Sequence, residues 1–233
     1  MRQLPLGVRL KDAAIFETYF AGPNVGAVAH LRSLSDGSGT GGVWLWGPAG
    51  SGKTHLLQAA CRAADESGRA AVYLPLEALA EHGAAPFDGW GDRDLVAVDD
   101  LDAIAGQPAL ERALFRLYND LHEQGGHLLV TSLAAPAEVS VELADLRSRL
   151  AAGATYRLRR LDDEACVEAL RMRAAHRGLD LPPETARFLM RRLPRDMASL
   201  CGWLERLDHA SLAAQRRLTV PFVRGVLGEA GET

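Results

Sequence analysis

Cysteine is scarce in this sequence of 233 residues, and the three cysteines, Cys61, Cys166 and Cys201, form no C-x-x-C pair. Their spacing argues against a disulfide framework and against a thiolate metal site, and favours buried reduced thiols. Long apolar runs are also absent, because no stretch approaches the roughly 20 apolar residues of a membrane span. The first residues lack the apolar core of a secretion signal. We therefore expect a soluble cytoplasmic protein that does not bind a membrane.

Positive charge and aromatic side chains are both in short supply. The net charge is −4, and only 6% of the residues are aromatic. Residues 1–157 carry 13 basic and 19 acidic side chains, and residues 158–233 carry 13 and 11. Proteins that bind single-stranded nucleic acid strongly combine a basic groove with stacking aromatic rings. The composition therefore predicts no strong direct DNA binding.

Lysine is rarer still, and its position is informative. The sequence has 24 arginines and two lysines, and one of the two, Lys53, lies inside the pattern G-x-x-x-x-G-K-T. This pattern is typical of a phosphate-binding loop, in which backbone N–H groups and a helix N-terminus surround a polyphosphate. The residues that we expect to bind the nucleotide are Gly47, Pro48, Ala49, Gly50, Ser51, Gly52, Lys53, Thr54 and His55. Lys53 is expected to reach the outer phosphates and Thr54 to ligate Mg²⁺, whereas His55 belongs to the first helical turn and is not a general base.

Two carboxylates, Asp99 and Asp100, follow an apolar strand predicted over residues 95–98. Proteins with a phosphate-binding loop carry acidic residues for Mg²⁺ and water in this place. We expect Asp99 to support Mg²⁺ and Asp100 to polarise a water; the alternative is that both only cap the end of the strand. The side chain of Asp100 is shorter than that of the Glu common at this position in phosphate-loop ATPases with rapid turnover, so slow hydrolysis is expected.

Polar residues also end two later segments. Thr131 and Ser132 come at the end of the strand predicted over residues 127–131, where their hydroxyls either contact a terminal phosphate or form a simple turn. Arg147 and Arg149 come at the end of the α/β part. An arginine in this place either stabilises transition-state charge on a neighbouring subunit's nucleotide or forms a surface ion pair.

The order of the predicted elements indicates the fold class. Apolar runs alternate with helical patterns up to about residue 157, and only helical patterns follow. The predicted strands are 43–46, 70–74, 95–98 and 127–131, and the predicted helices are 24–34, 53–67, 76–82, 108–124, 163–177, 183–193, 196–213 and 220–227, the first of them capped by Asn24. This order predicts an α/β fold with a mostly parallel sheet between helices, followed by a small all-helical domain. We expect an extended tail over 1–12, the α/β core over 13–157 and the helical domain over 158–233.

The loop, the paired carboxylates and the Arg-Ser-Arg element, in this order, resemble the AAA+ ATPases of the DnaA branch. Residues 16–24 are similar to the stretch that lines the adenine pocket in that branch. Residues 114–119 and, most specifically, residues 207–223 are similar to the Hda family, the regulatory inactivators of DnaA. The resemblance covers nearly the whole chain, and it implies an AAA+ P-loop core with a helical lid.

This resemblance also implies a function and partners. Hda-type proteins dock on the DNA sliding clamp, the beta subunit of DNA polymerase III, and stimulate hydrolysis of DnaA-bound ATP, which prevents re-initiation. Arg149 falls at the position of the arginine finger, and Arg147 is then a supporting residue. The residues that resemble the clamp-binding peptide are Gln3, Leu4, Leu6 and Val8. The implied ligand is ADP, or alternatively ATP, with Mg²⁺, and a homo-oligomer is left open.

The sequence departs from the family pattern at two positions. Leu133 stands where DnaA has an Asp after the sensor strand, and Ala198 stands where the lid carries the sensor 2 Arg. Arg195 lies one turn earlier on the same helix face and is the candidate substitute. Two other functions stay open: a DnaC-type helicase loader that binds single-stranded DNA, and a self-sufficient ATPase.

Overall fold

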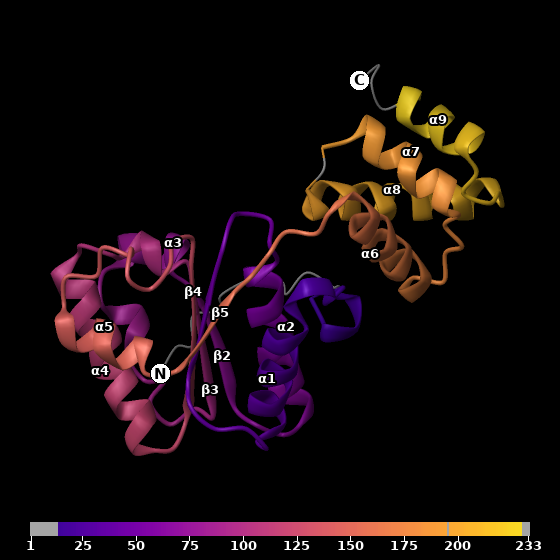
Figure 1. The fold of residues 1–233 in the computed structure, drawn as a ribbon. Helices are drawn as coiled ribbons and strands as arrows, with labels where there is room; N and C mark the ends of the chain where they lie inside the picture. The colour runs from indigo at the N-terminus through magenta and orange to yellow at the C-terminus, as the bar shows by residue number, and fades with distance from the viewer. Residues whose placement is uncertain (1–13, 195, 230–233) are drawn as a thin grey trace. The chain divides into compact units, whose positions relative to one another are not determined.

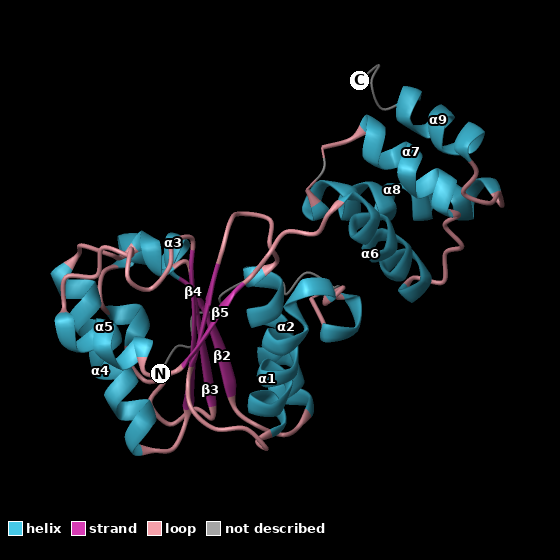
Figure 2. Cartoon of the chain, viewed as in Figure 1, coloured by secondary structure: helices cyan, strands magenta, loops and turns pink. Residues whose placement is uncertain are grey.

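The chain divides after Arg159 into two compact units, in a computed structural model that describes residues 14–194 and 196–229 (Figure 1). The first unit is an α/β domain and the second is all-helical, which confirms the predicted fold class (Figure 2). The division lies two residues beyond the boundary expected at 157. The expected tail, with the clamp-binding candidates Gln3, Leu4, Leu6 and Val8, lies outside the described residues, and so does Arg195.

Five parallel strands form the sheet of the first unit. They are β1 (Val43–Trp46), β2 (Ala71–Pro75), β3 (Leu95–Asp99), β4 (His127–Ser132) and β5 (Ala154–Arg157), and they lie in the order β2-β3-β4-β1-β5. The four predicted strands are present, and β5, which was not predicted, pairs with β1 at one edge. Because all the strands are parallel, the loops that follow them gather at the carboxyl edge of the sheet.

Helices cover both faces of this sheet (Figures 1 and 2). One face carries α1 (Val25–Asp36) and α2 (Lys53–Glu66), and the other carries α3 (Leu76–Leu79), α4 (Pro108–Glu123) and α5 (Ala144–Ala151). Neighbouring strand residues point to opposite faces, so Trp44 and Val98 join the cluster of α4 whereas Leu45 and Ala97 join that of α1 and α2.

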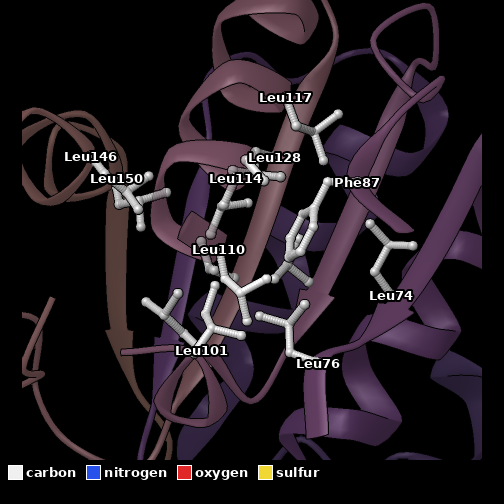
Figure 3. Close-up of a cluster of buried hydrophobic side chains, with 14 of the residues drawn as sticks. Leu74, Leu76, Phe87, Leu101, Leu110, Leu114, Leu117, Leu128, Leu146 and Leu150 are labelled. Atoms are coloured by element: carbon white, nitrogen blue, oxygen red, sulfur yellow. The ribbon is translucent and has the colours of Figure 1, made fainter. Parts of the chain in front are cut away.

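The apolar cluster beside α4 is the larger part of the core. Leu110, Leu114, Leu117 and Leu121 of this helix recur at helical spacing and are all buried. Figure 3 shows Leu110, Leu114 and Leu117 of α4 directed into the same cluster as Phe87. Each fully buried leucine contributes about 2 kcal/mol, so this face holds α4 firmly against the strands.

The described residues of the second unit form four helices around a core of their own. They are α6 (Asp163–His176), α7 (Pro183–Arg192), α8 (Met197–Ala214) and α9 (Val220–Glu229), and they match the four predicted helices within a few residues. Asp162 caps α6 by accepting from the N–H of Ala165, and Asp196 caps α8 by accepting from the N–H of Ser199. None of the helices in the two described ranges is long and apolar enough to cross a membrane.

Asn24 does not cap α1, which corrects the sequence prediction. Its side chain makes no capping hydrogen bond and is 4% exposed. The Nδ2 group donates to the Tyr19 hydroxyl at 2.9 Å and to the carbonyl oxygen of Arg159 at 3.1 Å, and Oδ1 accepts from the N–H of Arg159 at 2.9 Å. Asn24 therefore joins the start of the unit to the end of its sheet, a role that local sequence does not reveal.

The three cysteines are free thiols in helices. Cys61 and Cys166 are buried and Cys201 is half-buried. Burial raises the pKa of Cys61 to about 12, so this thiol is protonated and unreactive at neutral pH.

Candidate functional site

The loop between β1 and α2 turns tightly at the carboxyl edge of the sheet and ends at Lys53, where α2 begins. Gly47 has a φ of 150°, and a Cβ atom there would collide with the carbonyl oxygen of Leu158. Gly52 has a φ of 90°, and the ring of Tyr19 occupies the space that its Cβ would need. Both positions therefore require glycine, which allows the loop to pack closely against its neighbours.

The N-terminus of α2 offers hydrogen-bond donors to an anion. No side chain caps this helix of 14 residues, so its first N–H groups and its partial positive charge are directed at the loop. The hydroxyl of Ser51 is buried and has no hydrogen-bond partner among the residues that the structure describes. A buried polar atom without a partner is costly, and a phosphate oxygen would satisfy it. A phosphate group therefore fits the chemistry of this loop.

Lys53 lies against the inner side of the loop. It is 6% exposed, and its Nζ donates to the carbonyl oxygens of Gly47 at 2.9 Å and Pro48 at 3.5 Å. Thr54 follows in the first turn of α2 with an exposed side chain. These positions are compatible with the expected roles of Lys53 at the outer phosphates and of Thr54 at Mg²⁺.

Asp99 ends β3 and is 2% exposed. Its Oδ2 accepts a hydrogen bond from the Tyr73 hydroxyl at 2.7 Å, and its Oδ1 accepts one from the Thr131 hydroxyl. Burial and then the negative charge of Asp99 raise the pKa of Tyr73, so the phenol stays protonated and remains a donor. Hydroxyls from β2 and β4 thus hold the carboxylate from both sides. Sequence reasoning identified Asp99 but missed Tyr73, which reads there as an ordinary strand residue.

Asp100 differs from Asp99 in both backbone and environment. Its φ of 59° is left-handed, which is uncommon for a residue with a side chain, and its N–H donates to Thr131 Oγ1 at 2.9 Å. Burial and then the charge of Asp99 raise the pKa of Asp100, whereas the charge of Lys53 lowers it. The end of β3 therefore lies within the electric field of the Lys53 ammonium.

Thr131 and Ser132, at the end of β4, have separate roles. The Thr131 hydroxyl bonds to the carboxylate of Asp99, which neither of the two alternatives for this residue had included. Ser132 Oγ accepts from the indole N–H of Trp44 at 2.7 Å and donates to the carbonyl oxygen of Ala134 at 2.7 Å. Ser132 therefore forms the simple turn.

The segment before α1 packs against the loop. The Tyr19 hydroxyl donates to the carbonyl oxygen of Ser51 at 3.2 Å. The Nε2 atom of His55 lies 2.9 Å from the carbonyl oxygen of Ile15, and the His55 ring lies 5.6 Å from that of Tyr19. His55, which was grouped with the nucleotide ligands, therefore holds this segment onto α2. Tyr19 comes from the stretch that resembles an adenine pocket, and it lies beside the loop.

The two candidate arginines are exposed on α5. Arg147 donates to the carbonyl oxygen of Val141 at 3.3 Å, within its own segment. Arg149 lies in the last turn and lines a cavity of about 320 Å³ with Tyr118, His122 and the first residues of β1 and β4. Those strand starts form the edge of the sheet opposite to the phosphate-binding loop. Arg149 is therefore not directed at the loop of its own chain.

Glu111, in the first turn of α4, fixes the segment that leads into α5. It is fully buried. Its Oε1 accepts from the N–H groups of Gly106 at 2.8 Å and Glu142 at 3.0 Å, and its Oε2 accepts from the N–H of Leu143 at 2.7 Å. The carboxylate thus joins the loop after Asp100 to the start of the helix that carries Arg149. No feature of the sequence distinguished Glu111 from an exposed acid in the first turn of a helix.

Replacing Glu111 by alanine is expected to lower the free energy of unfolding by about 3 kcal/mol, because three N–H groups lose the buried carboxylate that accepts from them. Urea unfolding measures this change. Glu123→Ala, at the exposed end of the same helix, is the matched control and should change stability by less than about 0.5 kcal/mol. Equal effects of the two substitutions would contradict the structural role of Glu111.

The described residues contain no group of three or more His, Cys, Asp or Glu side chains that could hold a metal ion by themselves. Mg²⁺ usually keeps several waters and is bound through one or two protein oxygens together with substrate phosphates. Thr54 and Asp99 fit that pattern, in which the nucleotide supplies the other ligands.

Comparison with known families matches both units. The model described as the bacterial DnaA ATPase domain matches residues 10–157, and the model described as the lid domain of Hda matches residues 162–227.

Solved structures share the fold. Domain III of the Thermotoga maritima replication initiation protein DnaA is 20% identical, with a TM-score of 0.73 over 94% of this chain and 97% of that one. AMPPCP-bound DnaA from Aquifex aeolicus is 20% identical, with a TM-score of 0.69 over 84% of this chain and 65% of that one. RuvB of Thermotoga maritima, a Holliday junction branch migration motor, is 16% identical, with a TM-score of 0.65 over 91% of this chain and 72% of that one. The match over residues 10–157 covers more than half of the chain, which therefore belongs to the family of bacterial DnaA ATPase domains and is an Hda/DnaA-like AAA+ protein.

Proposed function

We propose that this chain is an adenine-nucleotide-bound regulator that stimulates the hydrolysis of ATP held by DnaA and so prevents re-initiation of replication. The proposal rests mainly on the position of Arg149. It is exposed on α5, beside the edge of the sheet that lies opposite to the chain's own phosphate-binding loop. An arginine placed there is free to act on a nucleotide held by another protein. The Hda lid match over residues 162–227 supports the same reading.

The nucleotide, ADP or ATP, would bind at residues 47–54. The glycine turns, the N-terminus of α2 and the partnerless Ser51 hydroxyl support this assignment. The DnaA of Aquifex aeolicus was solved with the ATP analogue AMPPCP bound. Lys53 would exchange its loop carbonyls for the outer phosphates. Thr54 and Asp99 would hold Mg²⁺, which neutralises phosphate charge when it is bound.

Hydrolysis by the chain itself would be slow. Asp100 is the candidate for polarising a water, but its side chain is short and its backbone is held away from ordinary strand geometry. Ala198, at the expected sensor 2 position, has no charged group and is exposed in its own unit. The catalytic contribution that we propose is therefore made in trans, by Arg149. Titration calorimetry with ADP and a hydrolysis assay with DnaA test the two halves of the proposal separately.

The clamp-binding tail is part of the proposal and rests on residues 3–8. Replacing Gln3 and Leu4 together by alanine should weaken binding to the sliding clamp by about thirtyfold, because an amide and one apolar anchor are lost. Surface plasmon resonance on immobilised clamp measures this change. The melting temperature is the control and should not change. Undiminished clamp binding would contradict the assignment of the tail.

A DnaC-type loader would need exposed rings on which bases can stack. Several rings of the second unit are instead covered by its own arginines. The Cζ atom of Arg206 lies 4.9 Å from the centroid of the Trp203 ring, and that of Arg216 lies 5.4 Å from the centroid of the Phe222 ring. We therefore propose a cytoplasmic regulator that acts on DnaA and on the clamp. Titration with single-stranded DNA at physiological salt separates the two functions.

A further inference from the structure

We propose that Tyr73 is a positioning residue, which orients the carboxylate of Asp99 toward the Mg²⁺ of the bound nucleotide. The inference rests on the proposed nucleotide binding and adds to it a residue on a strand that carries no part of the loop. Tyr73 lies on β2, at the middle of the strand that pairs with β3.

The geometry of Asp99 gives the first support. An ionised carboxylate has about four acceptor sites on its two oxygens. Tyr73 uses one site on Oδ2 and Thr131 uses one site on Oδ1. Two donors on two oxygens fix the plane of the group and still leave acceptor sites on both. A carboxylate held in this way is pre-organised for a third partner.

The second support is the way in which Tyr73 joins separate elements. The Tyr73 hydroxyl donates to Asp99 of β3, and its ring packs against the apolar cluster that includes Leu57 of α2. The same helix carries Thr54, the expected Mg²⁺ ligand, in its first turn. Tyr73 thus contacts the strand that carries Asp99 and packs with the helix that carries Thr54.

The third support is the strained residue next to this carboxylate. Asp100 adopts a left-handed backbone, and Thr131 accepts from its N–H at 2.9 Å while donating to Asp99. Such a conformation persists where the surroundings determine it, and it is found most often at functional sites. Tyr73 and Thr131 together therefore hold the end of β3 in one arrangement.

The test compares ADP binding with and without the metal. The dissociation constant of ADP is measured by titration calorimetry in excess Mg²⁺ and again in EDTA. The dissociation constant in EDTA divided by that in Mg²⁺ is the factor by which Mg²⁺ strengthens ADP binding. Tyr73→Phe should leave the value in EDTA unchanged and reduce the ratio by about tenfold, because a hydrogen bond to a charged group is lost.

Tyr156→Phe is the matched control. Tyr156 lies on β5 and packs against the same apolar cluster as Tyr73, and its hydroxyl lies 3.2 Å from His30 Nδ1. This substitution removes a hydroxyl of the same kind without touching Asp99. The ratio should stay at the value of the parent, and a fall equal to that of Tyr73→Phe would overturn the proposal.

Thr131 supplies a second pair of variants in case Tyr73→Phe impairs folding. Thr131→Ser keeps the hydroxyl and should keep the Mg²⁺ effect, whereas Thr131→Val removes the hydroxyl and should reduce the effect by about tenfold. A parent that binds no ADP would reject the proposed function itself. A parent with a clear Mg²⁺ effect that neither Tyr73→Phe nor Thr131→Val reduces would overturn this inference alone.

Discussion

Replacing Arg149 by alanine is expected to lower the rate at which DnaA-bound ATP is hydrolysed by about 10³-fold from its value with the parent chain. If the basal rate of DnaA is reached before that, the rate should fall to the basal rate. A guanidinium aimed at another protein's nucleotide stabilises charge that grows in the transition state, so its loss affects rate and not association. Because Arg149 is exposed, the variant should fold and bind ADP as the parent does. Single-turnover hydrolysis with DnaA in excess measures the change.

Two further substitutions make this result specific. Arg147→Ala removes an arginine of the same helix whose guanidinium donates to the carbonyl oxygen of Val141, and this variant should stimulate DnaA nearly as well as the parent. Arg149→Lys should restore little activity, because an ammonium lacks the fork geometry of guanidinium. If Arg147→Ala is inactive and Arg149→Ala is not, the two assignments must be exchanged.

Replacing Lys53 by alanine should remove the thermal stabilisation by ADP. Lys53 brings the main positive charge to the loop, whereas the glycine turns and the N-terminus of α2 stay in place. At ADP concentrations of about 100 times the dissociation constant, binding stabilises the parent by about 2.7 kcal/mol, which appears as a rise of several degrees in the midpoint of unfolding. Differential scanning fluorimetry with and without ADP measures this rise.

Arg62→Ala is the control for charge on the same helix. Arg62 is exposed on α2, where it pairs with Glu66 at 2.8 Å, and its loss should leave the stabilisation by ADP intact. A Lys53→Ala variant that ADP stabilises as strongly as it does the parent would show that the nucleotide binds elsewhere.

The sequence predicted those elements whose residues are strongly patterned. β3 and β4 are apolar runs that are buried on both faces, and α4 has leucines at helical spacing. β5 was missed because Ala154–Arg157 is short and alternates between half-buried and exposed positions at the edge of the sheet. Its only signal is backbone pairing with β1, which a sequence does not display.

Contacts between distant residues were beyond sequence reasoning. Asn24 has the local features of a helix cap, but its partner Arg159 lies 135 positions further along the chain. Tyr73 has the propensity of an ordinary strand residue, and only the pairing of β2 with β3 brings it to Asp99. The pattern around the loop predicted a tight glycine turn followed by a helix because these features are local, whereas the network around Asp99 is assembled by the sheet.

Whether Arg149 stimulates hydrolysis in trans is tested most directly by following nucleotide that is bound to DnaA alone. DnaA is loaded with labelled ATP, freed of unbound nucleotide, and mixed with clamp on DNA and with either this chain or its Arg149→Ala variant. We expect rapid conversion of the label to ADP with the parent chain and conversion at the basal rate of DnaA with the variant. Conversion that is no faster with the parent chain than with DnaA and clamp alone would contradict this expectation.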